Sequence, residues 1–151
     1  MVSLTDDVRA AEAAVLDLID LDVATRDPTV SPQLRRRLTL MRQRREEGLP
    51  GVRLSVAAGL LGISERTVRD WAARGPLDLV PGAKPARVST ASLARVVPLV
   101  KQLQAMGQDR DLLRALLERL EDERVRSLPR VKKSLKQMER GDYELLSSAD
   151  L

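Results

Sequence analysis

The sequence contains no cysteine and no histidine among its 151 residues. A zinc finger, a thiol-based sensor and a histidine-based catalytic triad are therefore excluded, and we expect no metal site and no cofactor. Aromatic residues are scarce as well, since Phe is missing and only Trp71 and Tyr143 are present. The core must then be built from Leu, Val and Ala, which favours packed helices over a β-sandwich.

Long apolar runs are also missing. No segment approaches the ~20 apolar residues that a membrane-spanning helix needs. The first residues are acidic and lack the basic start and apolar stretch of a signal peptide. We therefore expect a cytoplasmic protein with no membrane partner. A chain of this length suits one modest domain, or a small core with helical arms.

Charge is unevenly distributed along the chain. Residues 1–30 have a net charge of −5, residues 31–50 of +4 and residues 51–107 of +5, whereas residues 108–151 are neutral overall. A basic region is commonly just a solvated face. Here it coincides with the motif described below, which favours a polyanionic partner.

The first 50 residues predict a pair of helices. One begins near Thr5 and ends at Asp27-Pro28, and the second covers 32–47 after Ser31 as its N-cap. An acidic helix followed by an arginine-rich helix indicates an antiparallel hairpin or a dimer arm, and phosphate contact by the second helix is the alternative.

Residues 51–107 predict a compact unit of helices and a small β element. Ser55 is expected to cap a short helix over 56–61. The turn residues within 76–88 predict a small hairpin or loop, and a helix restarts at Ser89 or Thr90 and ends at Gly107. Beyond it, Asp109 is expected to cap a further helix that continues to about residue 126.

The stretch "LLGISERTVRDWAARG", residues 60–75, is the most informative part of the chain. A small residue at Ala58, a glycine at Gly62 and an aliphatic residue at Val68 have the spacing of a helix-turn-helix. Ser64 is placed to cap the second helix, and Gly75 to end it. We expect the inward-facing residues to be Ala57, Leu61, Ile63, Val68, Trp71 and Ala72. The outward-facing residues are then Glu65, Arg66, Thr67, Arg69, Asp70 and Arg74.

An exposed helix with Arg and Thr side chains and a free N-terminus suits the DNA major groove. Arginine can bind guanine edges or phosphate, and threonine can meet a base edge or a methyl group. An adaptor that binds only proteins would not require this set of side chains, but it stays the rival class. The chain has no paired carboxylates on a rigid element, no nucleophile–base pair and no phosphate-binding glycine loop, which predicts a non-enzymatic protein.

The run "RLSVAAGLLGISERTVRDWAARGPLDLV" followed by "ARVSTASLARVV" resembles the DNA-binding domain of MerR-like and excisionase-like winged helix-turn-helix proteins. The resemblance covers roughly residues 53–103. It implies a mainly α fold, in which a helix-turn-helix domain with a small β wing is flanked by helical N- and C-terminal extensions. The domains would be a hairpin over 1–50, the DNA-binding domain over 51–107, and C-terminal helices and a tail over 108–151. The residues implied to contact double-stranded DNA are Ser64, Arg66, Thr67, Arg69 and Arg74 of the second helix, and Lys84 and Arg87 of the wing.

Two features of this sequence differ from the pattern of that family. The wing lacks the Gly-Gly-His-Arg-Arg-Tyr-like run that the family often has, and 50 residues precede the motif. The implied function is a sequence-specific transcriptional regulator, and the alternative within the family is an excisionase-like factor that shapes DNA. A homodimer is expected because specificity usually comes from two half-sites, and its seam is either the 1–47 hairpin or the 110–138 helices.

The segment "SLPRVKKSLKQMERGDYELLSSADL", from Ser127 on, has an apolar stripe and many cations. Its layout is similar to the C-terminal tails of bacterial antitoxins, in which a DNA-binding module precedes a tail that folds on the toxin. The resemblance implies that the protein is the autoregulating antitoxin of such a pair, with a toxin as its partner. The residues assigned to that contact are Leu128, Val131, Leu135, Met138 and Tyr143.

Overall fold

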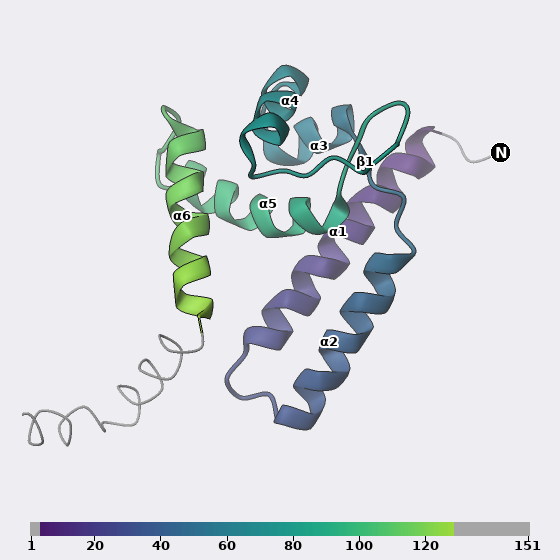
Figure 1. Ribbon diagram of the computed structural model, residues 1–151, viewed down its shortest axis with the longest axis vertical. Coiled ribbons are helices and arrows are strands. Elements are labelled where there is room, and N and C mark those ends of the chain that lie inside the picture. The colour runs from purple at the N-terminus through teal and green to yellow at the C-terminus, as the bar shows by residue number, and fades with distance from the viewer. Residues whose placement is uncertain (1–3, 129–151) are drawn as a thin grey trace, which may run out of the picture. The chain divides into compact units, whose positions relative to one another are not determined.

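The computed structural model describes residues 4–128, and by its internal contacts the chain divides into two compact units, one ending at Leu116 and one beginning at Leu117. The described part is mainly helical with one small antiparallel sheet, as predicted (Figure 1). The helices are α1 (Leu4–Arg26), α2 (Pro32–Glu47), α3 (Leu54–Leu61), α4 (Glu65–Arg74), α5 (Thr90–Ala105) and α6 (Leu112–Ser127). The strands are β1 (Val52–Arg53) and β2 (Arg87–Val88).

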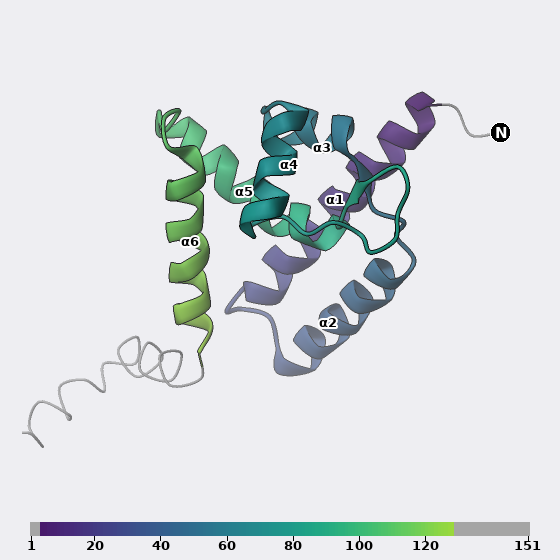
Figure 2. The same cartoon turned by 45° about the horizontal axis from the view of Figure 1, so that its top comes forward.

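The core of the first unit is built around α1 and α5. These two helices pack against each other, and α3 and α4 pack against one another beside them (Figures 1 and 2). The buried side chains are almost all aliphatic, as the lack of aromatic residues requires. They include Ala14, Val15 and Leu18 of α1 and Leu93, Val96, Val97 and Val100 of α5. The first helix is therefore part of the core on which the helix-turn-helix rests.

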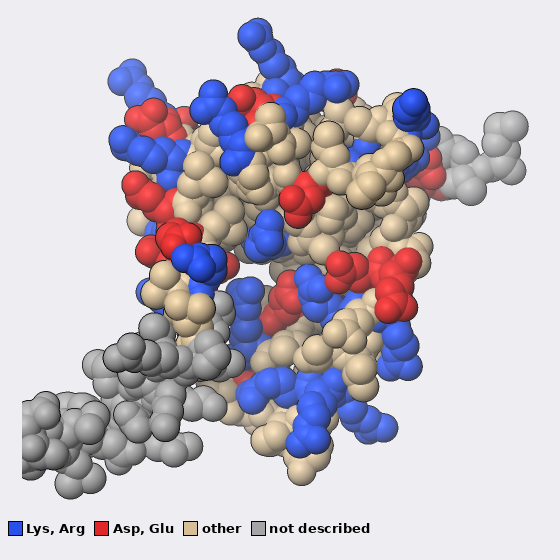
Figure 3. Space-filling view, viewed as in Figure 1, with Lys and Arg blue, Asp and Glu red and all other residues tan. Residues whose placement is uncertain are grey.

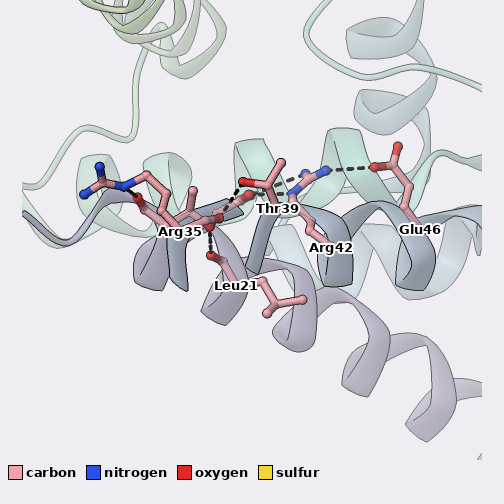
Figure 4. A network of polar contacts seen from close by, with 7 residues as sticks. Leu21, Arg35, Thr39, Arg42 and Glu46 are labelled. Carbon is pink, nitrogen blue, oxygen red and sulfur yellow. Dashed lines mark hydrogen bonds and ion pairs between the residues drawn. The ribbon is translucent and has the colours of Figure 1, made fainter. Parts of the chain in front are cut away.

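The first two helices form the predicted antiparallel hairpin (Figure 1). Arg42 of α2 bridges Asp22 of α1 and Glu46 of its own helix (Figure 4). Burial of this guanidinium opposes its charge, but the hydrogen bonds and the attraction of the two carboxylates outweigh burial and raise the pKa of Arg42. Arg35 closes the hairpin loop, since its Nε donates to the carbonyl of Thr25 at 3.0 Å (Figure 4).

The small sheet joins two segments that lie far apart in the sequence. Strands β1 and β2 are antiparallel, with Val52 opposite Val88 and Arg53 opposite Arg87. Leu79 forms a further bridge to Val88, so the segment between them returns on itself as a wing. The sequence predicted this wing, but it did not predict β1 as its partner.

The cap predictions had mixed outcomes. Ser31 accepts a hydrogen bond from the N–H of Leu34 and caps α2, and Ser89 caps α5 in the same way. The cap at Ser55 was wrong, because β1 runs directly into α3 and leaves Ser55 inside the helix. The cap at Asp109 was also wrong, because the left-handed backbone of Asp111 (φ 54°) delays the start of α6 to Leu112.

The described residues contain neither a candidate membrane span nor a candidate metal site. No helix within 4–128 is long and apolar enough to cross a membrane. The same part of the chain contains no group of three or more acidic side chains arranged to hold a metal ion. Of the residues assigned to a protein partner, Leu128 is exposed. The others, Val131, Leu135, Met138 and Tyr143, lie outside the described residues.

Candidate nucleic-acid interface

A tight turn joins α3 to α4. Gly62 has φ 67° and ψ 34°, and its N–H donates to the carbonyl of Ala58, which also accepts from Ile63 at 3.1 Å. This left-handed conformation is easy only for glycine, which explains why the chain has glycine at this position. The turn residues are followed by Ser64, whose side chain accepts from the N–H of Thr67 and begins α4. The predicted helix-turn-helix geometry is therefore present.

The inner face of α4 holds it against the rest of the unit. Val68 and Trp71 are buried, as are Ala57 and Leu61 on the facing helix. Ile63 and Ala72, also predicted to face inward, are half-buried. Burial of an aromatic ring and three aliphatic side chains fixes the rotation of α4 about its axis, and this rotation decides which side chains face outward.

The outer face of α4 is basic, and α4 lies on the outside of its unit (Figure 2). Arg66 and Arg69 are exposed, and neither makes a hydrogen bond or ion pair with another described residue. Arg74 differs, since its Nε donates to Asp70 at 2.9 Å one turn earlier. Lys and Arg side chains protrude over α4 at the top of Figure 3. Two guanidinium groups on the exposed face of α4 are thus available to an anion.

The two hydroxyl residues assigned to DNA contact are already bonded to one another. The side-chain oxygens of Ser64 and Thr67 lie 2.9 Å apart, and the N–H of Thr67 donates to Ser64 at 3.1 Å. Ser64 is exposed and Thr67 is half-buried. Both residues therefore have a role in starting the helix, whatever else they contact.

The two wing residues differ in their surroundings. Lys84 is exposed at the wing turn and has no polar partner among the described residues. Arg87 lies at the root of the wing, is half-buried, and donates from Nη1 to the carbonyl of Gly51 at 3.2 Å. The structure thus places one wing cation toward solvent and ties the other into the sheet.

Two further cations lie near the wing root: Arg53 was absent from the sequence-based prediction, and Arg45 entered it only as part of the arginine-rich second helix. Arg53 lies opposite Arg87 on the neighbouring strand, and Arg45 at the end of α2 lines the same cavity as both. Their spacing in the sequence gives no signal, because the three arginines come together only through the fold.

Comparison with known families gives a match to part of the chain. The model of a family described as a homeodomain-like domain matches residues 31–75, which contain α2, α3 and α4. Neither the curated proteins nor the solved structures gave a match. The match and the turn geometry agree that this part of the chain contains a helix-turn-helix.

Proposed function

We propose that this protein is a sequence-specific DNA-binding transcriptional regulator that inserts α4 into the major groove. The observation that supports the proposal is the division of α4 into two faces. Its apolar face is buried through Val68 and Trp71, while Arg66 and Arg69 are exposed without an intramolecular partner. Guanidinium groups on an exposed second helix can form paired hydrogen bonds to guanine or bind phosphate.

The wing supports the MerR-like and excisionase-like subtype. A short β element follows α4 in the chain, and its turn presents Lys84 to solvent. A cation in this position can contact phosphate beside the groove that α4 occupies. An excisionase-like protein that bends DNA, with no regulatory role of its own, is the alternative that uses the same surfaces.

We also propose that the protein acts as a homodimer, because one helix-turn-helix covers only a single half-site. The hairpin offers apolar side chains for such a contact. No residue of α2 is buried, and Leu34 and Met41, two turns apart on it, are 47% and 48% exposed. Light scattering at tens of micromolar without DNA tests the dimer, and a monomeric mass at that concentration contradicts it.

The test of DNA recognition is selection of binding sites from a random duplex library with the purified full-length chain. We expect one enriched sequence with related half-sites. Fluorescence anisotropy should then show a much higher affinity for this sequence than for a scrambled duplex at moderate salt. Enrichment of no sequence by folded protein would contradict the proposal and favour the rival class, a helical adaptor that binds only proteins.

The recognition surface has a matched control in α2. Arg37 is exposed, has no polar partner among the described residues, and lies in the half of α2 next to the hairpin loop. That loop is at the opposite end of the unit from α4 (Figure 1). Arg66→Ala should lower specific binding, and Arg37→Ala should not. Equal losses would instead favour phosphate contact by the arginine-rich α2.

The antitoxin role is the more specific proposal, and it rests on the sequence from Leu128 onward. Leu128 is 43% exposed, and it is the first residue of the apolar stripe that the sequence predicts. Deletion of residues 128–151 should leave DNA binding largely intact but remove protection against a toxic protein encoded by a neighbouring gene. Unfolding of the truncated chain, or unchanged protection, would contradict this proposal while leaving the DNA-binding proposal standing.

A further inference from the structure

A cavity of about 160 Å³ lies where the N-terminal hairpin meets the root of the wing. One wall is the face of α1 that carries Ala10, Ala11 and Ala14, and the opposite wall comes from the end of α2, strand β1 and β2. No residue of α4 lines it, so the cavity is separate from the recognition helix, although Arg87, which was assigned to DNA contact from the wing, is part of the lining.

Positive charge is in excess around this cavity. Three arginines line it, Arg45, Arg53 and Arg87, together with a single carboxylate, Asp7. That carboxylate makes one contact to Arg53, at 3.1 Å, with both side chains about two-fifths exposed. Arg45 reaches only Asp17, at 3.3 Å, and Asp17 is not part of the lining.

The arrangement of these cations is costly without a ligand. Arg53 and Arg87 lie directly opposite one another on antiparallel strands, a position in which like charges destabilise a sheet. The available carboxylate balances only one of them. An anion between the two guanidinium groups would turn this repulsion into two favourable contacts.

Two polar groups at the cavity lack a partner. The Nε of Arg53 is buried and makes no hydrogen bond. Thr90 is only 5% exposed, lines the cavity, and its hydroxyl makes no hydrogen bond to another described residue. Buried donors are nearly always satisfied, so the buried and unpaired Nε of Arg53 indicates a missing acceptor.

The N-terminus of α5 also favours an anion in this cavity. Thr90 is the first residue of this 16-residue helix, whose N-terminal end has a partial positive charge. An oxyanion at Thr90 would therefore meet a hydroxyl, a helix N-terminus and the arginine side chains together.

The rest of the lining is apolar, and it limits what the anion can be. Alanine side chains of α1 and the side chains of Leu49, Val52 and Val56 leave room for a hydrocarbon group. A cavity of about 150 Å³ in another protein accommodates benzene, so the apolar part of the ligand is roughly that size. A bare inorganic ion would leave this apolar wall without a partner.

We propose that this cavity binds a small organic carboxylate whose apolar part is about the size of a benzene ring. The carboxylate would bind Arg53 and Arg87, with Thr90 as a further donor, and the hydrocarbon part would pack on the alanine face of α1. This inference goes beyond DNA recognition. Because Arg87 is at the wing root and Ala11 is in the hairpin, an occupied site would join these two parts of the unit.

The test is calorimetric titration of the full-length protein, without DNA, with acetate, isovalerate and benzoate. We expect saturable binding that strengthens from acetate to benzoate. Benzamide has the shape of benzoate without its charge and should bind at least tenfold more weakly. Failure of all three carboxylates to bind at millimolar concentration would overturn the proposal.

Three variants locate the site. Arg53→Gln removes the central cation and Ala11→Leu fills the cavity without changing charge, so each should weaken benzoate binding at least tenfold. Arg37→Gln, which removes an exposed arginine from the hairpin far from the cavity, should leave it unchanged. Thermal melts by circular dichroism check folding, and Ala11→Leu tests the site even where Arg53→Gln does not fold.

The same variants distinguish binding of an organic carboxylate from binding of a DNA phosphate. If Arg53→Gln weakens DNA binding and the protein binds inorganic phosphate but no carboxylate, Arg53 contacts DNA phosphate and the proposal is wrong. Equal benzoate affinities in all three variants would place binding elsewhere and overturn it as well.

Discussion

The side-chain oxygens of Ser64 and Thr67 lie 2.9 Å apart at the first turn of α4. The same serine accepts the N–H of Thr67 at 3.1 Å, so one hydroxyl satisfies two groups of the residue three positions later. This contact fixes where α4 begins. It therefore also sets where Arg66 and Arg69 leave the helix, on the face that the buried Trp71 leaves exposed.

Replacement of Ser64 by alanine should destabilise the helix-turn-helix by about 1 kcal/mol, because an N-terminal N–H of α4 loses its acceptor. Asparagine at this position still caps, so Ser64→Asn should cost far less. Urea titrations followed by the fluorescence of Trp71, the only tryptophan of the chain, report this unfolding. If Ser64→Asn and Ser64→Ala lose the same stability, the hydroxyl is not acting as a cap.

Arg66→Ala and Arg69→Ala should each weaken binding to the selected DNA site by about 1–3 kcal/mol if these side chains read bases. Arg87→Ala should lower affinity evenly across sequences and reduce the salt dependence, as expected for a phosphate contact. Anisotropy titrations on specific and scrambled duplexes at several salt concentrations distinguish the two patterns. The assignment of α4 as the recognition helix is wrong if all three variants behave alike.

Trp71→Ala should destabilise the first unit by about 3–5 kcal/mol, because the buried indole leaves a cavity between α4 and its neighbours. Circular dichroism during urea titration measures the loss, since the fluorescent probe is then absent. Reduced DNA binding by this variant would follow from unfolding and would not identify a contact. A loss below about 1 kcal/mol would contradict the burial on which the orientation of α4 depends.

The sequence alone predicted the features that depend on local chemistry. The turn at Gly62, the cap at Ser64 and the inward positions of Val68 and Trp71 follow from spacing within 20 residues, and the structure confirms them. The hairpin of α1 and α2 was predicted from opposite charges on neighbouring helices, and it is present with Arg42 bound to Asp22.

The features that the sequence did not predict depend on contacts between distant segments. A two-residue strand has no periodicity of its own, so β1 is defined only by pairing Val52 with Val88. The packing of α1 on α5 and the pairing of Arg53 with Arg87 also join segments that lie far apart in the sequence. The failed cap at Ser55 is a consequence, because the paired strand carries the backbone directly into α3.

The pKa of Asp27 in the hairpin loop should lie below its ordinary value. The hydroxyl and the N–H of Thr29 donate to its carboxylate at 2.6 and 2.8 Å and lower the pKa, with a smaller contribution from Arg35. Thr29→Val removes the hydroxyl and keeps the N–H, so the pKa should rise toward the ordinary value without fully reaching it. Carboxyl carbon NMR titration measures both proteins.

The lowered pKa of Asp27 makes the stability of the fold depend on pH. A carboxyl whose pKa is lower in the folded state stabilises the fold above its unfolded pKa of about 3.9, and the contribution is lost as pH falls through the folded value. The difference in stability between the wild type and Thr29→Val should therefore shrink as the pH is lowered from neutral through that range. A difference that stays constant with pH would show that the hydroxyl does not act through Asp27.

Gly51→Ala should destabilise the first unit by about 2–4 kcal/mol, because it combines backbone strain with a steric clash. Gly51 has φ 90°, and a Cβ there would lie 2.6 Å from Cγ2 of Val80 and 3.2 Å from the carbonyl oxygen of Val88. Gly62→Ala is the matched control, since Gly62 also has positive φ but its nearest neighbour would be an ordinary 3.6 Å away. That variant should lose only about 1–2 kcal/mol, the strain alone. Urea titrations followed by Trp71 fluorescence compare the two, and equal losses would mean that the wing can move away from β1 without cost.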